Sequence, residues 1–393
     1  MDPVRNPFAP GAGNPPPELA GRSAVLDDVG VTLRRIALAK PAQSSILVGL
    51  RGVGKTVLLI RIDETAQRET FKTLYIEAHE DKSLPELLVP GLRRILISLS
   101  VLQLGRNAAR QALRVLSSFV RSIKLKVHDI DLELGIDPEV GSADSGDLEA
   151  DLPSLFLSIG QAAKSAGIPI VILIDEMQYL KKKEFSALIM AIHRTSQANL
   201  PVTLVGAGLP QILGLAGDSK SYAERLFKYP KIGALDEHDA RDAILGPVQA
   251  EGAMIDEAAI SEILSVTERY PYFLQQWGHE AWNIAGDGRI SKNDILKATS
   301  AAIVKLDESF FRVRFDRCTP AEKRYMRALA ELGPGTHRSG EIAEKLSLKT
   351  TNVGPTRDKL IRKGMIYSPQ HGDTAFTVPL FDAYMRRVMP TLD

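Results

Sequence analysis

Cysteine and long apolar runs are nearly absent from this sequence. Cys318 is the one cysteine among 393 residues, which excludes an internal disulfide and a zinc site made of several cysteines. No stretch approaches the roughly 18 consecutive apolar residues of a membrane-spanning helix. The first 17 residues contain six prolines instead of the apolar core of a secretion signal. We therefore expect a cytoplasmic protein without a membrane partner.

The chain also carries almost no net charge. Its formal value is +1, so no field over the whole molecule draws it to nucleic acid or to a membrane, and any such surface must be local. Hydrophobic residues make up 44% and charged residues 25%, which is typical of a soluble globular protein. The length predicts two or three domains.

Two neighbouring segments each contain a single type of charge. Residues 87–128 have eight Lys and Arg but no Asp or Glu, whereas residues 129–151 have nine acidic residues and no basic ones. Apolar residues at helical spacing predict two basic amphipathic helices broken near Gly105, and alternation over residues 124–136 predicts a strand or hairpin. Two interpretations remain open: a solvated basic face beside an acidic loop, or an insertion that contacts an acidic partner or a neighbouring subunit.

One short stretch has a specific pattern. Gly49–Thr56 reads GLRGVGKT, which is the G-x-x-x-x-G-K-T pattern of a phosphate-binding P-loop. Its three glycines allow a tight turn in which backbone N–H groups point at phosphate oxygens. A short apolar run precedes it, and the segment after it can open a helix whose N-terminus favours the same anion. We expect ATP or ADP to bind Gly49, Gly52, Val53, Gly54, Lys55, Thr56 and Val57.

A second motif lies downstream. Five apolar residues, 170–174, are followed by Asp175 and Glu176, which predicts a buried parallel strand with two carboxylates at its tip. Lys55 of the P-loop supplies a cation to the phosphates, and the Thr56 hydroxyl together with Asp175 is expected to hold Mg²⁺. Glu176 is the candidate general base that polarises the attacking water.

Strands and helices alternate through about residue 232. This order predicts an α/β fold with a mainly parallel sheet. Asp236, Asp256 and Ser291 are expected helix caps before three later apolar-periodic segments, and these segments predict a helical lid. The expected parts are an N-terminal arm and helix (1–40), a P-loop core (41–232) with a charged insertion at about 87–151, a helical lid (233–305) and a C-terminal module (306–393).

The order of GLRGVGKT, IVILIDE, VTLVGAGLP and AERLFKYPKIGAL resembles the AAA+ ATPases, in the branch that links origin-recognition initiators with STAND signalling ATPases. The PPELAGR stretch is similar to the N-terminal box of that branch, which packs beside adenine. The resemblance implies that Arg225 is an arginine finger acting in a neighbour's site, hence a homo-oligomer. It also implies that Tyr270 and Pro271 line the base. An exposed arginine at a helix end and a plain helix break are the alternatives for these positions.

The chain departs from the family in two places. At the end of the fourth core strand it has Val205-Gly206-Ala207-Gly208 where many members carry a polar sensor residue, and Thr203 is the only nearby hydroxyl. An unambiguous second sensor arginine is missing as well. The resemblance therefore implies a slow Mg²⁺-dependent ATPase whose nucleotide binding is better supported than its turnover.

The C-terminal module has a capping box at Thr319–Glu322, two further helical segments and a hairpin after Gly364. This order resembles a winged helix. Its third helix would be the recognition helix, and between residues 319 and 393 twelve Lys and Arg face eight Asp and Glu. Contacts with double-stranded DNA are expected from Lys349, Arg357, Lys359 and Arg362.

Two functions from different classes remain open. In the first, ATP hydrolysis drives assembly or conformational change and acts on DNA through the winged helix. In the second, the protein is a STAND-type switch whose winged helix packs on protein.

Overall fold

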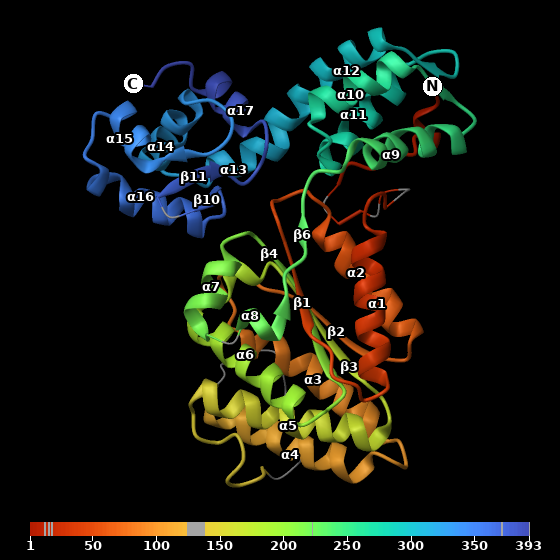
Figure 1. The fold of residues 1–393 in the computed structure, drawn as a ribbon, viewed down its shortest axis with the longest axis vertical. Helices are drawn as coiled ribbons and strands as arrows, with labels where there is room; N and C mark the ends of the chain where they lie inside the picture. Colours follow the sequence, from red (N-terminus) through yellow and green to blue (C-terminus); the bar gives the residue numbers. More distant parts are fainter. Residues whose placement is uncertain are drawn as a thin grey trace.

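The computed structural model describes residues 1–393 except residues 12, 15, 17, 18, 124–137, 222, 371 and 393. The strand or hairpin predicted for residues 124–136 lies outside the described residues. Figure 1 shows a sheet with its helices in the lower body, and a helical lid and a C-terminal module side by side above it. No described helix is long and apolar enough to cross a membrane.

The core is a six-stranded sheet in the order β2-β3-β4-β1-β5, with β6 also paired to β1. Each of these pairings is parallel, as predicted. β1, β3 and β4 are buried along their whole length because helices cover both faces. The strands are β1 (Ser44–Gly49), β2 (Lys72–Glu77), β3 (Ile170–Asp175), β4 (Val202–Gly208), β5 (Phe227–Lys228) and β6 (Lys231–Ile232).

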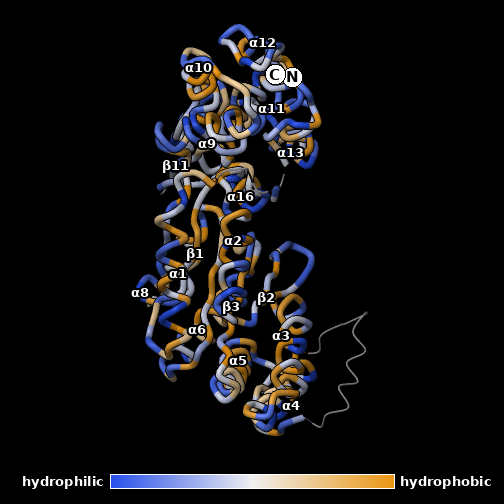
Figure 2. Tube along the Cα trace, turned by 90° about the vertical axis from the view of Figure 1, so that its right-hand side faces the viewer, coloured by the Kyte–Doolittle hydropathy of each residue, from blue (hydrophilic) through white to orange (hydrophobic). Residues whose placement is uncertain are grey.

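Alternate residues of β1, β3 and β4 enter two separate hydrophobic clusters. Leu47 and Val205 face the cluster that contains α1 and α2, while Ile46 and Leu204 face the one that contains α3, α5 and α6. In Figure 2 hydrophobic positions follow β1 and β3 between these helices. The helices are α1 (Ser23–Ala37), α2 (Lys55–Arg68), α3 (Leu84–Ser100), α4 (Arg106–Ser122), α5 (Leu148–Ala166), α6 (Lys182–Gln197), α7 (Ile212–Ser219) and α8 (Ala223–Leu226).

The basic segment forms α3 and α4, and the break between them falls at residues 101–105, where it was predicted. These helices and α5 lie at the end of the molecule opposite the lid (Figures 1 and 2). α5 begins at Leu148, and Asp151 in its first turn accepts the N–H groups of Ser145 and Gly146, which closes the preceding turn. Arg114 pairs with Glu139 at 3.9 Å, so the described part of the acidic segment returns to the basic helix.

The lid contains the predicted helices, but it is not helical throughout. β7 and β8 form a small two-stranded parallel sheet. Asp236 caps its helix as predicted, whereas the Asp256 side chain makes no cap and accepts Arg289 Nε at 2.6 Å. The elements are α9 (Glu237–Ala250), β7 (Met254–Ile255), α10 (Glu257–Thr267), α11 (Pro271–Ile284), β8 (Arg289–Ile290) and α12 (Lys292–Lys305).

The C-terminal module contains the predicted helices and hairpin. The Thr319–Glu322 capping box is present, and β10 pairs antiparallel with β11. A third strand, β9, and a last helix, α17, were not predicted. The elements are α14 (Pro320–Glu331), β9 (His337–Arg338), α15 (Ser339–Lys345), α16 (Thr350–Arg362), β10 (Ile366–Tyr367), β11 (Asp373–Phe376) and α17 (Phe381–Val388).

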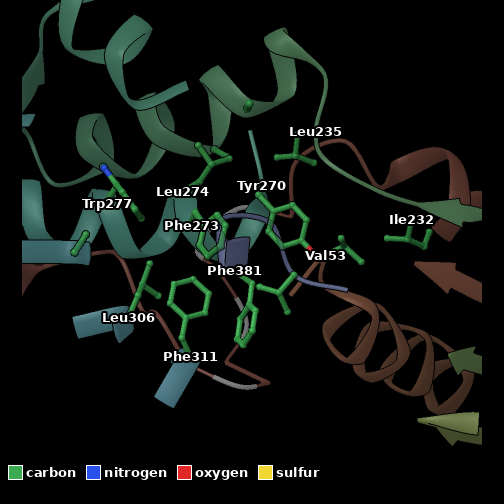
Figure 3. Close-up of a cluster of buried hydrophobic side chains, with 14 of the residues drawn as sticks. Val53, Ile232, Leu235, Tyr270, Phe273, Leu274, Trp277, Leu306, Phe311 and Phe381 are labelled. Atoms are coloured by element: carbon green, nitrogen blue, oxygen red, sulfur yellow. The ribbon is translucent and has the colours of Figure 1, made fainter. Parts of the chain in front are cut away.

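One hydrophobic cluster joins the core, the lid and the C-terminal module. A π-helical segment, Leu306–Phe311, and α13 (Arg312–Asp316) connect the lid with the module. In Figure 3 Phe273 of the lid and Phe381 of the module lie near Phe311, and Val53 of the P-loop lies beside Tyr270 of the lid. The nucleotide-binding motif therefore shares its apolar surroundings with both smaller parts.

Candidate nucleotide-binding site

A cavity of about 520 Å³ lies between the P-loop and the lid. This volume is in the range of pockets that enclose a small organic ligand. Five parts of the chain contribute to its wall: the N-terminal arm, the P-loop, Glu176 after β3, the lid and the segment that leads into the C-terminal module. Representative lining residues are Asn14 and Leu19 of the arm, Gly54 and Thr56 of the P-loop, Leu235 and Pro271 of the lid, and Phe310 and Arg314 before the module.

The P-loop follows β1 directly and ends in α2. Gly52 and Gly54 have φ angles of 81° and 91°, in the left-handed region that glycine tolerates, so the turn requires them. Gly49 has another function. A Cβ there would lie 2.1 Å from the Ile232 carbonyl oxygen, so Gly49 allows β6 to approach β1. Gly49 does not line the cavity, whereas Gly52, Val53, Gly54, Lys55, Thr56 and Val57 do.

Lys55 is buried at the start of α2. Its ammonium donates to the carbonyl oxygens of Gly49 and Leu50 at 3.0 and 2.8 Å. Burial lowers the pKa of Lys55 to about 8, although the carboxylates of Glu176 and Asp175 act in the opposite direction. The side chain thus places a cation at the loop, where two backbone carbonyls accept its hydrogen bonds.

Thr56 in the first turn of α2 contacts Asp175 at the end of β3. The Thr56 hydroxyl donates to Asp175 Oδ2 at 2.6 Å, and burial raises the pKa of Asp175. A hydroxyl beside a buried carboxylate supplies the hard oxygen atoms that Mg²⁺ prefers, and Mg²⁺ is usually held by one or two protein ligands together with phosphates. The donor set therefore fits this ion.

Glu176 stands next to Asp175 with a φ of 53°, a left-handed conformation that is uncommon for a residue with a side chain. Its carboxylate accepts a hydrogen bond from Gln178 and lies 3.9 Å from Arg51. The Gln178 side-chain oxygen accepts the Leu209 N–H at the end of β4 at 3.0 Å. Gln178 therefore orients Glu176 from the strand end where the sequence has no polar sensor residue. Sequence reasoning missed it because no motif marks this glutamine.

Comparison with known proteins agrees with this geometry. Residues 18–205 match the family model of the AAA ATPase domain. The chain contains an AAA ATPase domain. Residues 308–385 match a second family model, described as a domain of unknown function. A search of the curated proteins gave no match. The match to the AAA ATPase domain supports ATPase activity for the chain.

Two solved structures have a similar fold. The Walker-type ATPase PABY2304 of Pyrococcus abyssi is 14% identical with a TM-score of 0.58, and the alignment covers 94% of this chain and 96% of that one. Cdc6p of Pyrobaculum aerophilum is 13% identical with a TM-score of 0.50 over 99% and 98% of the two chains. At such identities the likeness concerns the fold.

Of the two residues predicted to contact the base, only Pro271 reaches the cavity. Pro271 lines the cavity, but Tyr270 is buried behind it and its hydroxyl donates to the Arg51 carbonyl. The predicted contact of Tyr270 with the base is thus corrected: it supports the P-loop from behind. Tyr272, two residues later, lines the cavity and donates its N–H to the Gly52 carbonyl at 3.2 Å.

Arg225 and Thr203 do not reach the cavity of their own chain. Arg225 is exposed on α8, and α8 leads into β5, which pairs with the first residues of β1, far along the strand from the P-loop. A role in a neighbour's site remains a prediction. Thr203 is buried in β4 and bonds the Ser44 hydroxyl at 3.2 Å, which leaves it a structural residue of the sheet.

The pKa of Lys55 leads to a prediction on pH. Phosphates favour its charged form, and the ligand-free ammonium loses its proton above its pKa of about 8. We expect the Kd for ADP to rise about tenfold for each pH unit above the pKa and to be flat below it. Titration with a fluorescent ADP derivative at pH values below and above the pKa of Lys55 tests this prediction. A Lys55→Arg variant should bind with no such slope. A flat wild-type profile would contradict the role of Lys55.

Glu176→Gln should keep the shape of the site but remove the base. We expect kcat for ATP hydrolysis to fall by about 10²- to 10⁴-fold, with nucleotide affinity nearly unchanged. Phosphate release measured under saturating ATP provides the test. Glu77→Gln is the matched control, because Glu77 is exposed and lies opposite Asp175 in the register of β2 and β3. Equal turnover in Glu176→Gln and wild type would remove Glu176 from this role.

Proposed function

We propose that this ATPase is a nucleotide-gated switch whose C-terminal module responds to the state of the P-loop. The observation that carries the proposal is a direct contact between them: the Arg51 N–H donates to the Thr377 carbonyl at 3.3 Å. A Cβ on Gly364 would lie 2.7 Å from the Arg51 guanidinium, so the module approaches this residue closely. Binding or hydrolysis that shifts the P-loop therefore changes the surface on which the module rests.

The residues of the site support Mg²⁺-dependent hydrolysis of ATP. Lys55 and the loop N–H groups bind phosphate oxygens, and Thr56 with Asp175 would hold Mg²⁺. When bound, this ion supplies positive charge to the phosphates and orients them. Glu176, held by Gln178, accepts the proton of the attacking water. The departures from the family pattern favour slow turnover, which suits a switch better than a motor.

The proposed division of the chain follows the expected parts. Residues 1–40 form the arm and first helix, residues 41–232 the ATPase core with its insertion, residues 233–305 the lid and residues 306–393 a winged helix. The order of α14, α15, α16 and the β10-β11 hairpin supports a winged helix. Its docking on the core supports the STAND-like alternative of the family resemblance.

DNA binding is a second candidate function, and α16 supports it. Lys349 at its start, Lys359 and Arg362 are exposed, and their side chains form no ion pair or hydrogen bond with another described side chain, as the open face of a recognition helix requires. Arg357 differs from them. Its guanidinium bonds Thr374, Ser368 and the Asp373 carbonyl, so it holds the hairpin and is a poor probe of DNA contact.

The switch proposal predicts a nucleotide-dependent change of shape. We expect the radius of gyration from small-angle X-ray scattering to differ between ADP-bound protein and ATP-bound Glu176→Gln protein. Lys55→Ala, which lacks the phosphate-binding cation, should not respond. Mass from light scattering separates two causes: constant mass supports the switch, whereas growth with ATP supports a homo-oligomer with Arg225 acting in trans. Identical shape and mass with both nucleotides contradict the proposal.

The DNA candidate predicts salt-sensitive binding of a short duplex. Replacing both Lys359 and Arg362 by Ala should lower the affinity for DNA about tenfold or more. The slope of log affinity against log salt concentration should become shallower by about two, as expected for the loss of two phosphate contacts. Arg324→Ala is the control, since Arg324 is exposed on α14 of the same module. Fluorescence anisotropy at several salt concentrations measures both quantities. No binding at low salt, with or without ATP, rejects DNA as a partner and leaves the switch.

A further inference from the structure

The segment before the C-terminal module brings a further arginine to the nucleotide cavity, in addition to Arg22 and Arg51. Arg314 is on α13 and lines the cavity together with Arg51 and Lys55 of the P-loop. It belongs to the region that matches the domain of unknown function, not to the region that matches the AAA ATPase domain. The cavity wall thus contains a cation that the ATPase domain itself does not encode.

Arg314 has no carboxylate partner among the described residues. Its guanidinium lies 3.9 Å from the centre of the Phe310 ring and donates to the Phe310 carbonyl. Arg312, on the same short helix, is exposed and bonds Asp316 at 2.9 Å. A partly buried cation without a counter-charge is costly, and an anionic ligand in the cavity removes that cost.

The charges around Arg314 locate it at the phosphate end of the cavity. Burial and, to a smaller extent, the nearby Arg51 together lower the pKa of Arg314 to about 10, while Tyr272 and Glu176 act in the opposite direction. Arg314 therefore remains charged at neutral pH. Arg51 and Glu176 stand where the P-loop and the tip of β3 meet, which is the place of the outermost phosphate of a nucleotide in P-loop ATPases.

Arg314 is held in position by a chain of contacts that starts at the P-loop. Tyr272 donates its N–H to the Gly52 carbonyl at 3.2 Å, and its ring stacks on Phe310 with the centres 4.5 Å apart. Phe310 in turn lies under the Arg314 guanidinium. The arginine is therefore presented to the cavity in a fixed relation to the phosphate-binding loop.

A second, smaller cavity of about 150 Å³ adjoins Arg314 and Arg51 on the module side. Arg317 and Lys363 also line it, and no carboxylate does. Lys363 bonds Glu322 at 2.7 Å, which leaves the three arginines as the main source of positive charge. The wall between the P-loop and the module is thus positive on both sides of Arg314, as a site for several phosphate oxygens requires.

We propose that Arg314 binds the terminal phosphate of the nucleoside triphosphate held at the P-loop of the same chain, with Arg51 beside it. The triphosphate then fixes α13, and with it the C-terminal module, against the P-loop, and the diphosphate leaves α13 less firmly held. This inference rests on the proposed switch and names the residue that reads the nucleotide state. It needs no second subunit.

The test compares affinities for a non-hydrolysable ATP analogue and for ADP. In Arg314→Gln we expect the Kd for the analogue to rise about 10- to 100-fold, as for the loss of a hydrogen-bonded charge, and the Kd for ADP to rise less than about threefold. Arg314→Lys keeps the charge and should recover part of the loss. Arg312→Gln is the matched control on the same helix and should bind both nucleotides like the wild type. Calorimetric titration measures all four proteins.

Hydrogen exchange of residues 306–316 provides a readout independent of affinity. The analogue should protect this segment more than ADP does in the wild type, and Arg314→Gln should abolish the difference. Equal losses for both nucleotides, or none for either, overturn the assignment of Arg314. If the wild type changes shape with nucleotide while Arg314→Gln keeps its preference for the analogue, only this inference fails. If the wild type shows no change of shape, the proposed switch fails instead.

Discussion

The rest of the structure depends on how the carbonyl groups of the P-loop are satisfied. A loop that turns its N–H groups toward phosphate directs carbonyls outward, and buried carbonyls need donors. Here the donors come from distant segments: Arg22 before α1 bonds Val53, Tyr270 of the lid bonds Arg51, and Tyr272 bonds Gly52. The C-terminal module accepts the Arg51 N–H in return. The arm, the lid and the C-terminal module are therefore each bonded to the turn of residues 50–54 between β1 and α2. A shift of this turn changes the contacts of all three.

The N-terminal arm extends this connection across the lid. The Phe8 ring packs against Gly278 so closely that a Cβ there would lie 2.6 Å from it, and the Asp2 carbonyl accepts the Trp282 indole N–H at 2.8 Å. The arm then continues along the nucleotide cavity, where Asn14 and Leu19 form part of the wall. The lid and the arm thus pack together beside the nucleotide cavity. The hydrophobic cluster around Phe311 connects the lid with the module, so that motion of either part disturbs a common core (Figure 3).

Local patterns predicted most of the elements because each has a local physical cause. The parallel strands follow from continuous apolar runs, and the first helix of the module follows from the capping box at Thr319. Where prediction was wrong, a distant contact decided. Tyr270 was expected beside the base, but its hydroxyl donates to the Arg51 carbonyl of the P-loop. Arg357 was expected to contact DNA, but its guanidinium donates to the Asp373 carbonyl and so holds the hairpin of its own module.

The sequence by itself determined that a nucleotide is bound, since the P-loop pattern encodes a backbone turn, a cation and a hydroxyl within eight consecutive residues. It also determined the parallel sheet that brings Asp175 to Thr56. Only the tertiary structure decided which residues from other parts of the chain lie around the P-loop and its cavity. Gln178 and Arg314 carry no local signal, because a glutamine after a strand and an arginine on a helix are ordinary surface residues until folding encloses them. Their importance comes from the packing of the lid and module on the P-loop, which depends on contacts between residues far apart in the chain.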